Sequence, residues 1–258
     1  MNTIIIIHEL LCPKFEENKS ILIANIDIII KTFIDAMQSL FSTQNISTIP
    51  IKFAKYLATV LCKIASNEEL ISNISYEILF QLSEELLSNL LIENLDKIGN
   101  SQEGSIIFKS LNSTMLRILE NCNSTYVILS LLELIRKYRC NEEKNKLAGL
   151  SIKCLLKVNQ NLEAIISNIE VDRILLQIHL LLIDIEKTSG DLHPKNQTDQ
   201  VVIKYIKNLI NEIVKIKKNK IIEDYNKGVK SNSVPDKYIA VWIKNCLSIL
   251  QMENNKKK

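Results

Sequence analysis

One helix in the second half of the chain is apolar on almost every side. Between residues 171 and 185, apolar side chains recur at the spacing of one helix face, at Val171, Ile174, Leu175, Ile178, Leu181, Leu182 and Ile185. Three further residues, Leu176, Leu180 and Ile183, widen that face to almost the whole circumference. A helix of this kind must be buried on most sides, because its apolar surface is costly to expose to water. The pattern therefore predicts a sizeable α-helical body built around this segment.

The rest of the chain favours an all-α fold. The 258 residues are 47% hydrophobic and include only 5 Gly and 4 Pro, so few residues interrupt helices. Pro50, after Ser47 and Thr48, and Pro235, after Ser231-Asn232-Ser233, mark helix starts, since proline is tolerated at the first helical position. We predict helices at about 3–12, 20–42, 50–66, 74–93, 103–121, 124–139, 144–160, 171–187, 200–217 and 235–252, with short helices near 161–168 and 219–227.

Helices of this number and spacing suit an α-solenoid of the HEAT type. Such arrays stack helical pairs of about 40 residues each and need not show a sharp sequence repeat. A compact helical bundle is the alternative architecture. Nothing between the helices has the composition of a flexible linker, so we expect residues 1–252 to form a single domain. The lysine-rich residues 253–258 are expected to be a disordered tail.

Composition excludes several classes of function. The six cysteines contain no CxxC pair and most lie on apolar helical stripes, so we expect buried, reduced thiols, no metal and no cofactor. The apolar run at 4–7 is too short for a signal peptide or a membrane span. A net charge of +3 does not by itself indicate a nucleic acid or membrane partner. These features predict a cytoplasmic protein.

No catalytic constellation is visible, so we do not expect an enzyme. The chain has no phosphate-binding loop, no Rossmann glycine pattern and no HExxH motif. Of the three histidines, His179 lies on the mostly apolar helix and is expected to be a satisfied, half-buried residue. Asp172 and Arg173, in the first turn of the same helix, are interpreted as structural residues that tie it to neighbouring helices, with partner contact as the alternative.

The helix predicted at 200–217 carries a lysine face. Lys204, Lys207, Lys215 and Lys218 fall on one side of it, opposite the apolar positions, and Lys217 and Lys220 extend the positive charge past its end. Such a face is either solvated or a docking strip for an acidic coiled coil or for the acidic surface of tubulin. Aromatic residues do not interleave with these lysines, which argues against binding of single-stranded nucleic acid.

Three collinear blocks of sequence resemble a known family. The matching residues are Leu111-Asn112 … Ile118-Leu119-Glu120 … Asn123-Ser124-Thr125 … Ile128–Leu132, then Lys153-Cys154-Leu155 … Val171–Leu176 … Ile178-His179, then Lys207–Ile210 … Ile213–Lys217 … Lys220-Ile221. Together they resemble the C-terminal conserved domain of the TOG-domain microtubule polymerases, the ch-TOG, Msps and MOR lineage. The resemblance is strong from about residue 110 to residue 250.

The resemblance implies a TOG-like paddle of six helical pairs and a non-enzymatic role. In the family, the C-terminal region recruits the polymerase to centrosomes or spindle poles through adaptor coiled coils such as TACC proteins. By this resemblance the docking residues are Lys204, Lys207, Lys215, Lys217 and Lys220, at positions where the family is also basic. The isolated domain is expected to be a monomer associated with cytoskeletal microtubules. An unrelated helical scaffold, or an unrelated α-solenoid that binds nucleic acid through the lysines between 204 and 220, stays open as an alternative.

Direct tubulin binding is the alternative that the family also suggests. Its tubulin-binding domains carry an exposed Trp in their first inter-helix loop. The corresponding segment here, about residues 12–20, has no Trp, although Lys14 and Phe15 could substitute weakly for it. The only Trp, Trp242, lies in the last predicted helix and is expected to pack against neighbouring helices. The resemblance therefore implies the fold more strongly than it implies contact with tubulin.

Overall fold

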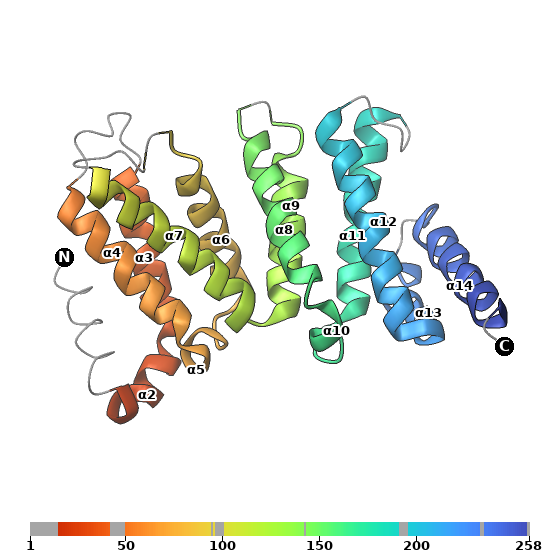
Figure 1. Ribbon diagram of the computed structural model, residues 1–258, viewed down its shortest axis with the longest axis horizontal. Helices are drawn as coiled ribbons and strands as arrows, with labels where there is room; N and C mark the ends of the chain where they lie inside the picture. Colours follow the sequence, from red (N-terminus) through yellow and green to blue (C-terminus); the bar gives the residue numbers. More distant parts are fainter. Residues whose placement is uncertain are drawn as a thin grey trace. The chain divides into compact units, whose positions relative to one another are not determined.

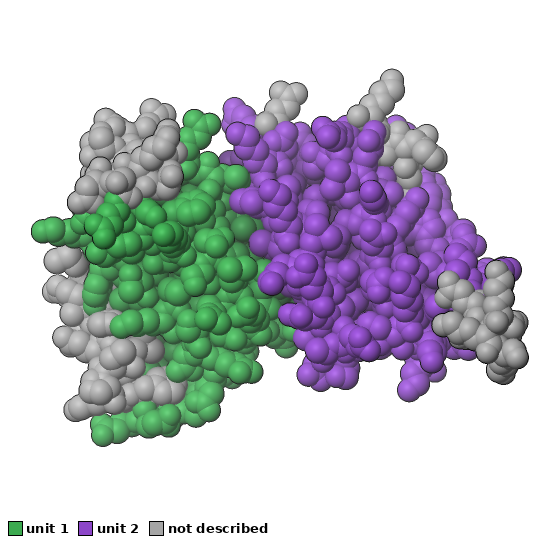
Figure 2. All heavy atoms as spheres, in the orientation of Figure 1, with its two compact units in different colours: residues 1–130 green, residues 131–258 purple. Residues whose placement is uncertain are grey.

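The computed structural model is built of α-helices, and no strand occurs among the residues that it describes (Figure 1). The described residues are 15–41, 50–93, 95, 101–141, 143–190, 196–232 and 235–256. They fall into two compact units, Met1–Ser130 and Leu131–Lys258, which Figure 2 colours green and purple. The structure confirms the predicted all-α class, with HEAT-like packing of neighbouring helices inside each unit. The prediction of a single domain stays a prediction.

The helices of the first unit are amphipathic segments that share one core. They are α2 (Phe15–Ala24), α3 (Ile26–Phe41), α4 (Ile51–Ser66), α5 (Glu68–Ile71), α6 (Tyr76–Leu90) and α7 (Ser101–Asn121), followed by the start of α8 (Ser124–Tyr138). Helix α4 packs along α7, and α6 packs against both α3 and α7. Phe33, Met37 and Leu82 are completely buried between them. At one end, the Asn121 amide donates to the backbone carbonyl of Ala65 at 2.8 Å, which joins the ends of α7 and α4.

The second unit is organised around the helix that the sequence marks as buried. After the end of α8 it contains α9 (Asn145–Asn159), α10 (Leu162–Ile165), α11 (Val171–Ser189), α12 (Gln197–Lys217), η3 (Lys218–Lys220), α13 (Ile221–Tyr225), η4 (Asn226–Lys230) and α14 (Ile239–Lys256). Helix α11 contacts α12, α13 and η4, while α12 also contacts α9 and α14. Ile174, Ile178 and Leu182 have no exposed surface, as predicted for an inner helix.

Helix ends follow local chemistry. The side chain of Asn67 accepts a hydrogen bond from Leu70 N at the start of α5, and Asn196 accepts one from Thr198 N at the start of α12. Helix α11 ends at Gly190, whose φ of +82° lies in the left-handed region that favours glycine. The caps at Gly190 and Asn196 lie within a few residues of the predicted end of the 171–187 helix and the predicted start of the 200–217 helix.

Several parts of the chain differ from the predicted helix pattern, and one is the short helix α5 (Glu68–Ile71), which was not predicted. The helix expected at 20–42 is two helices, because the backbone breaks at Asn25, whose side-chain amide donates to Ile21 O. Residues 15–20, expected to lie in a loop, belong to α2. Helix α14 starts at Ile239 instead of Pro235 and continues to Lys256, four residues into the predicted disordered tail. The helix predicted at 3–12 lies outside the described residues.

Candidate protein-interaction surface

Helix α12 buries its apolar side and exposes a row of lysines. Val202, Ile206 and Ile213 are buried, whereas Lys204, Lys207 and Lys215 are exposed, as the sequence pattern predicts. Two of these three lysines already have contacts within the chain. The Lys207 ammonium lies 5.0 Å from the centre of the Trp242 ring, and Lys215 pairs with Glu212 at 2.7 Å.

The end of α12 changes the arrangement of the remaining lysines. Lys217 is partly buried and pairs with Asp224 of α13 at 2.7 Å. Lys218 has a φ of +52°, which turns the backbone out of α12 into η3. Lys218 and Lys220 are exposed and form no ion pair with any residue that the structure describes. The lysines are therefore not a uniform row of free charges, and those with neither an ion pair nor an aromatic contact among the described residues are Lys204, Lys218 and Lys220.

Helix α14 lies beside the lysine face. Trp242 is a half-buried residue of α14. The centre of its ring lies 6.2 Å from the centre of the Tyr238 ring, and the Lys207 ammonium lies over the Trp242 ring. Burial raises the pKa of the Cys246 thiol, and the nearby positive charge of Lys215 opposes that rise. Lys207 and Lys215 thus lie along the seam between α12 and α14, which the amphipathic pattern of α12 alone does not reveal. The prediction that Trp242 packs against neighbouring residues is confirmed by these contacts.

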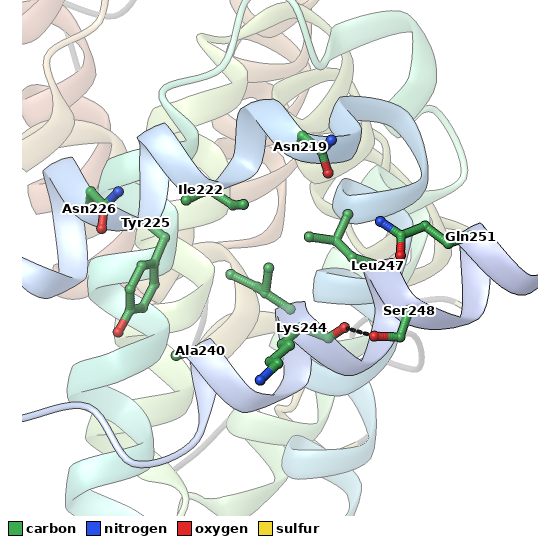
Figure 3. A pocket seen from close by; sticks show the side chains of 10 residues that line it. Asn219, Ile222, Tyr225, Asn226, Ala240, Lys244, Leu247, Ser248 and Gln251 are labelled. Carbon is green, nitrogen blue, oxygen red and sulfur yellow. Dashed lines mark hydrogen bonds between the residues drawn. The ribbon is translucent and has the colours of Figure 1, made fainter.

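An open groove lies between α14 and the segment from η3 to η4 (Figure 3). Its volume is about 480 Å³. The residues that line it are Asn219, Ile222, Tyr225, Asn226, Ala240, Ile243, Lys244, Leu247, Ser248 and Gln251. Its surface is mostly apolar, because Ile222 and Tyr225 line it from α13 and Leu247 from α14. The polar groups are amides and hydroxyls together with the Lys244 ammonium, which no described residue pairs.

Asp236 fixes the start of α14 beside this groove. Its carboxylate accepts hydrogen bonds from the backbone N–H groups of Tyr238, Ile239 and Ala240 at 2.8–3.0 Å, and from the Tyr225 hydroxyl at 3.1 Å. Burial alone would raise the pKa of Asp236, but these hydrogen bonds outweigh burial and lower it. Burial, together with the charge and hydrogen bond of Asp236, raises the pKa of Tyr225 to about 12.

His179 supports the same junction from α11. It is buried, as is the Asp236 side chain, and its Nδ1 lies 3.7 Å from Asp236 Oδ1. The sequence predicted a half-buried, satisfied histidine, and the structure places it deeper than that. Sequence reasoning missed Asp236, because the helix start was assigned to Pro235. A Pro-Asp pair shortly before an apolar helix is a helix-capping signal that could have identified it.

Asp172 and Arg173 occupy different environments. Asp172 is mostly buried and pairs with Lys227 of η4 at 2.7 Å, consistent with a role in joining adjacent elements. Burial would raise the pKa of the Asp172 carboxyl, but the hydrogen bond and charge of Lys227 lower it overall. Arg173 is partly exposed and pairs with Glu170 at 3.1 Å, within the same helix start. Asp172 therefore contacts a neighbouring helical element, whereas the Arg173–Glu170 ion pair stays within one helix start. The structural role of the two residues stays a prediction.

The structure only partly describes Lys14 and Phe15, the residues considered for contact with tubulin. Lys14 lies outside the described residues, and Phe15 is the first residue of α2, without a described side chain. No helix in the described part of the chain is long and apolar enough to span a membrane. Over the same residues, no group of three or more His, Cys, Asp or Glu side chains could hold a metal ion.

Comparison with known proteins identifies distant relatives. The chain is 26% identical to Protein MOR1 of Arabidopsis thaliana over 175 residues, which cover 63% of the chain and 9% of that protein. It is 27% identical to Protein MOR1 of rice over 145 residues, 51% of the chain and 7% of the relative. Centrosomal protein 224 of Dictyostelium discoideum is 27% identical over 195 residues, 73% of the chain and 9% of the relative.

The homology is distant and local. The chain spans less than a tenth of the length of these relatives. No family model matches it, and no solved structure does. The predicted relationship to the TOG-domain microtubule polymerases is confirmed as distant homology, whereas correspondence to their C-terminal domain stays a prediction.

Proposed function

We propose that this chain, a distant relative of MOR1 and Centrosomal protein 224, is a non-enzymatic docking module of a microtubule-associated protein. It binds an adaptor protein of the TACC coiled-coil type and so recruits its parent protein to the microtubules of the centrosome or spindle pole. The homology and the helical-pair fold support a protein-binding role. The name of the Dictyostelium relative supports the centrosome as the place of action.

The observation that carries the proposal is the set of exposed lysines on α12 and in η3 directly after it. Lys204, Lys218 and Lys220 are exposed and have no ion pair among the described residues. Acidic side chains of a partner can therefore approach them without displacing a contact within the chain. Charges of this kind accelerate association and select acidic partners more than they add affinity.

Charge reversal tests the docking surface. The triple variant Lys204→Glu, Lys218→Glu and Lys220→Glu replaces attraction of an acidic partner by repulsion, so recruitment of the parent protein to spindle poles should be lost. A triple reversal of the exposed α9 residues Lys146, Lys153 and Lys157 changes the net charge equally and should leave recruitment intact. The readout is localisation in cells, with circular dichroism of both purified variants. Normal localisation of the first variant with normal helicity would contradict the proposed surface.

Direct binding of tubulin is the second candidate function, because the family relationship includes proteins that bind it. Here the exposed lysines would meet an acidic tubulin surface instead of an adaptor. Binding to free tubulin in solution separates the two candidates.

A further inference from the structure

The groove between α14 and the η3–η4 segment has the dimensions of a site for a helix. It follows α14 from Ala240 to Gln251, which is about 16 Å at 1.5 Å per residue. Its volume of about 480 Å³ is about three times that of an apolar cavity of ~150 Å³ that holds one benzene molecule. About three large apolar side chains therefore fit, spaced along three turns of a partner helix.

The walls of the groove are apolar where a partner would enter. Ile222 has 44% of its surface exposed, although nearby Ile221 and Ile243 are buried. Leu247 points from α14 toward the opposite wall (Figure 3). The Tyr225 hydroxyl already donates to Asp236, so its ring contributes apolar surface to the groove. Occupying the groove would remove this apolar surface from water, which favours binding.

The charges around the groove indicate which side chains should border the apolar face of a bound helix. Lys218 and Lys220 are the neighbours of the lining residue Asn219, and Lys244 lines the groove itself. All three are exposed and have no ion pair among the described residues, whereas Glu223 is the exposed acidic residue beside Ile222. The nearby Asp224 is neutralised by Lys217. The rim is therefore positive and complements acidic side chains.

We infer that this groove receives a single amphipathic helix from a protein partner, with two or three apolar side chains buried and an acidic flank on Lys218, Lys220 and Lys244. This inference deepens the proposed docking function and rests on it for its biological setting. A closed coiled coil hides its apolar seam between its own helices, so only a helix with a free apolar face can fill the groove. The partner therefore offers an unpaired helix, or a coiled-coil helix with apolar residues outside its seam.

A designed peptide tests the groove with the full chain. The probe is a fluorescent, lactam-stapled helix of about 16 residues, with Leu at i, i+4 and i+7 and Glu on both flanks; the staple offsets the marginal stability of short helices. A scrambled peptide of equal composition and charge has no apolar face. Fluorescence polarisation should show saturable binding of the helical probe, at least tenfold tighter than the scrambled one and weaker at higher salt.

Matched variants locate the binding. Ile222→Glu and Lys244→Glu, at the groove, should each weaken the helical probe at least tenfold. Val241→Glu lies on α14 with 53% of Val241 exposed, but Val241 does not line the groove, so this control should bind as the parent chain does. Equal binding of both peptides, or an equal loss in the Val241→Glu control, would overturn the inference.

Two further outcomes separate the inference from the proposed function. If light scattering shows that the free chain is a dimer that Ile222→Glu converts to a monomer, the groove holds a second copy and the inference is wrong. If Ile222→Glu leaves cellular recruitment intact while reversal of Lys204, Lys218 and Lys220 abolishes it, the docking function stands and the groove is not its site. Circular dichroism of each variant verifies that the fold is retained.

Discussion

Gly228 packs so closely on the backbone of α11 that no larger residue fits without movement. A Cβ atom at this position would lie 2.1 Å from the carbonyl oxygen of Asp172 and 2.8 Å from its carbonyl carbon. Both obstacles are backbone atoms, so a side-chain rotation cannot relieve the clash. Glycine is needed here for close approach, and the Asp172–Lys227 ion pair lies at the same junction.

We therefore expect Gly228→Ala to lower the free energy of unfolding by about 1–3 kcal/mol, the usual cost of overpacking. Gly149→Ala is the matched control, because Gly149 lies inside α9 and a Cβ there would meet nothing within 4 Å. The control should be stabilised by up to about 1 kcal/mol through helix propensity. Urea unfolding of the two variants measures both effects. Equal stability of Gly228→Ala and the parent chain would show that the close contact does not persist in solution.

A buried ion pair joins the turn after α8 to the start of α12. The Arg139 guanidinium lies 2.8 Å from Asp199 Oδ2, and both side chains are almost fully buried. Arg139 also donates to the backbone carbonyl of Asp184 at 2.7 Å and to the Thr188 hydroxyl at 3.2 Å. Removing one charge would leave the other buried and uncompensated, which is more costly than losing the pair itself.

The variant Arg139→Met should accordingly lose about 3–5 kcal/mol of stability. The double variant Arg139→Met with Asp199→Leu should recover much of that loss, since it leaves no unpaired buried charge. Arg117→Met, at the exposed Arg117–Glu120 pair, is the control and should change stability by less than about 1 kcal/mol. Thermal unfolding of the parent chain and the three variants measures these differences in stability. A double variant no more stable than Arg139→Met would mean that packing, not charge, dominates this junction.

At the scale of single elements, helix α14 depends on the carboxylate that caps it. Asp236 accepts three backbone hydrogen bonds and one from Tyr225, and these contacts lower its pKa in the folded chain. A carboxyl with a lowered folded pKa adds stability above its unfolded pKa of about 3.9. That contribution is lost as the pH falls through the folded pKa.

Asp236→Asn should therefore flatten the pH dependence of unfolding below about pH 4. Asparagine also caps helices well, so the variant should still fold at neutral pH. Urea unfolding at a series of pH values between about 2 and 6 measures the difference. Asp35→Asn, at an exposed acidic residue of α3, is the control for general charge effects. If the free energies of unfolding of Asp236→Asn and of the parent chain change in parallel over the whole pH range, the capping role is contradicted.

For the molecule as a whole, the question is whether the chain binds tubulin by itself. Residues 12–20 contain no Trp, the residue that the family resemblance predicts for tubulin contact, and Trp242 is engaged with Lys207 and Tyr238. Without that anchor, the remaining exposed lysine contacts are each worth at most about 1 kcal/mol. We therefore predict that this surface associates with an acidic partner and does not form a stable complex with tubulin.

We expect gel filtration with free αβ-tubulin at micromolar concentration to show no stable complex. Co-elution that is lost in Lys14→Ala or Phe15→Ala would contradict this and favour direct tubulin binding. Ile222→Glu is the control in such a case, since it alters the groove and leaves residues 12–20 unchanged.

Local sequence determined the helices and the buried face of most of them. The apolar spacing of α11 predicted that Ile174, Ile178 and Leu182 are buried, because burial of a helix face depends on the order of residues along one segment. The same reasoning separated the exposed lysines of α12 from its apolar face. It failed at Asn25 and at the start of α14, where side-chain hydrogen bonds end or begin helices within an otherwise continuous pattern.

Only the tertiary structure decided which surfaces face one another. The lysines of α12 looked equivalent in sequence, but Lys207 lies over Trp242 and Lys217 pairs with Asp224, while Lys218 stays exposed. The groove combines residues 219–226 with residues 240–251, and the contact of His179 with Asp236 joins α11 to the residue that caps α14. Helical periodicity is a property of one segment, whereas these contacts depend on how segments pack. Packing is set by side chains far apart in the sequence, which no local pattern records.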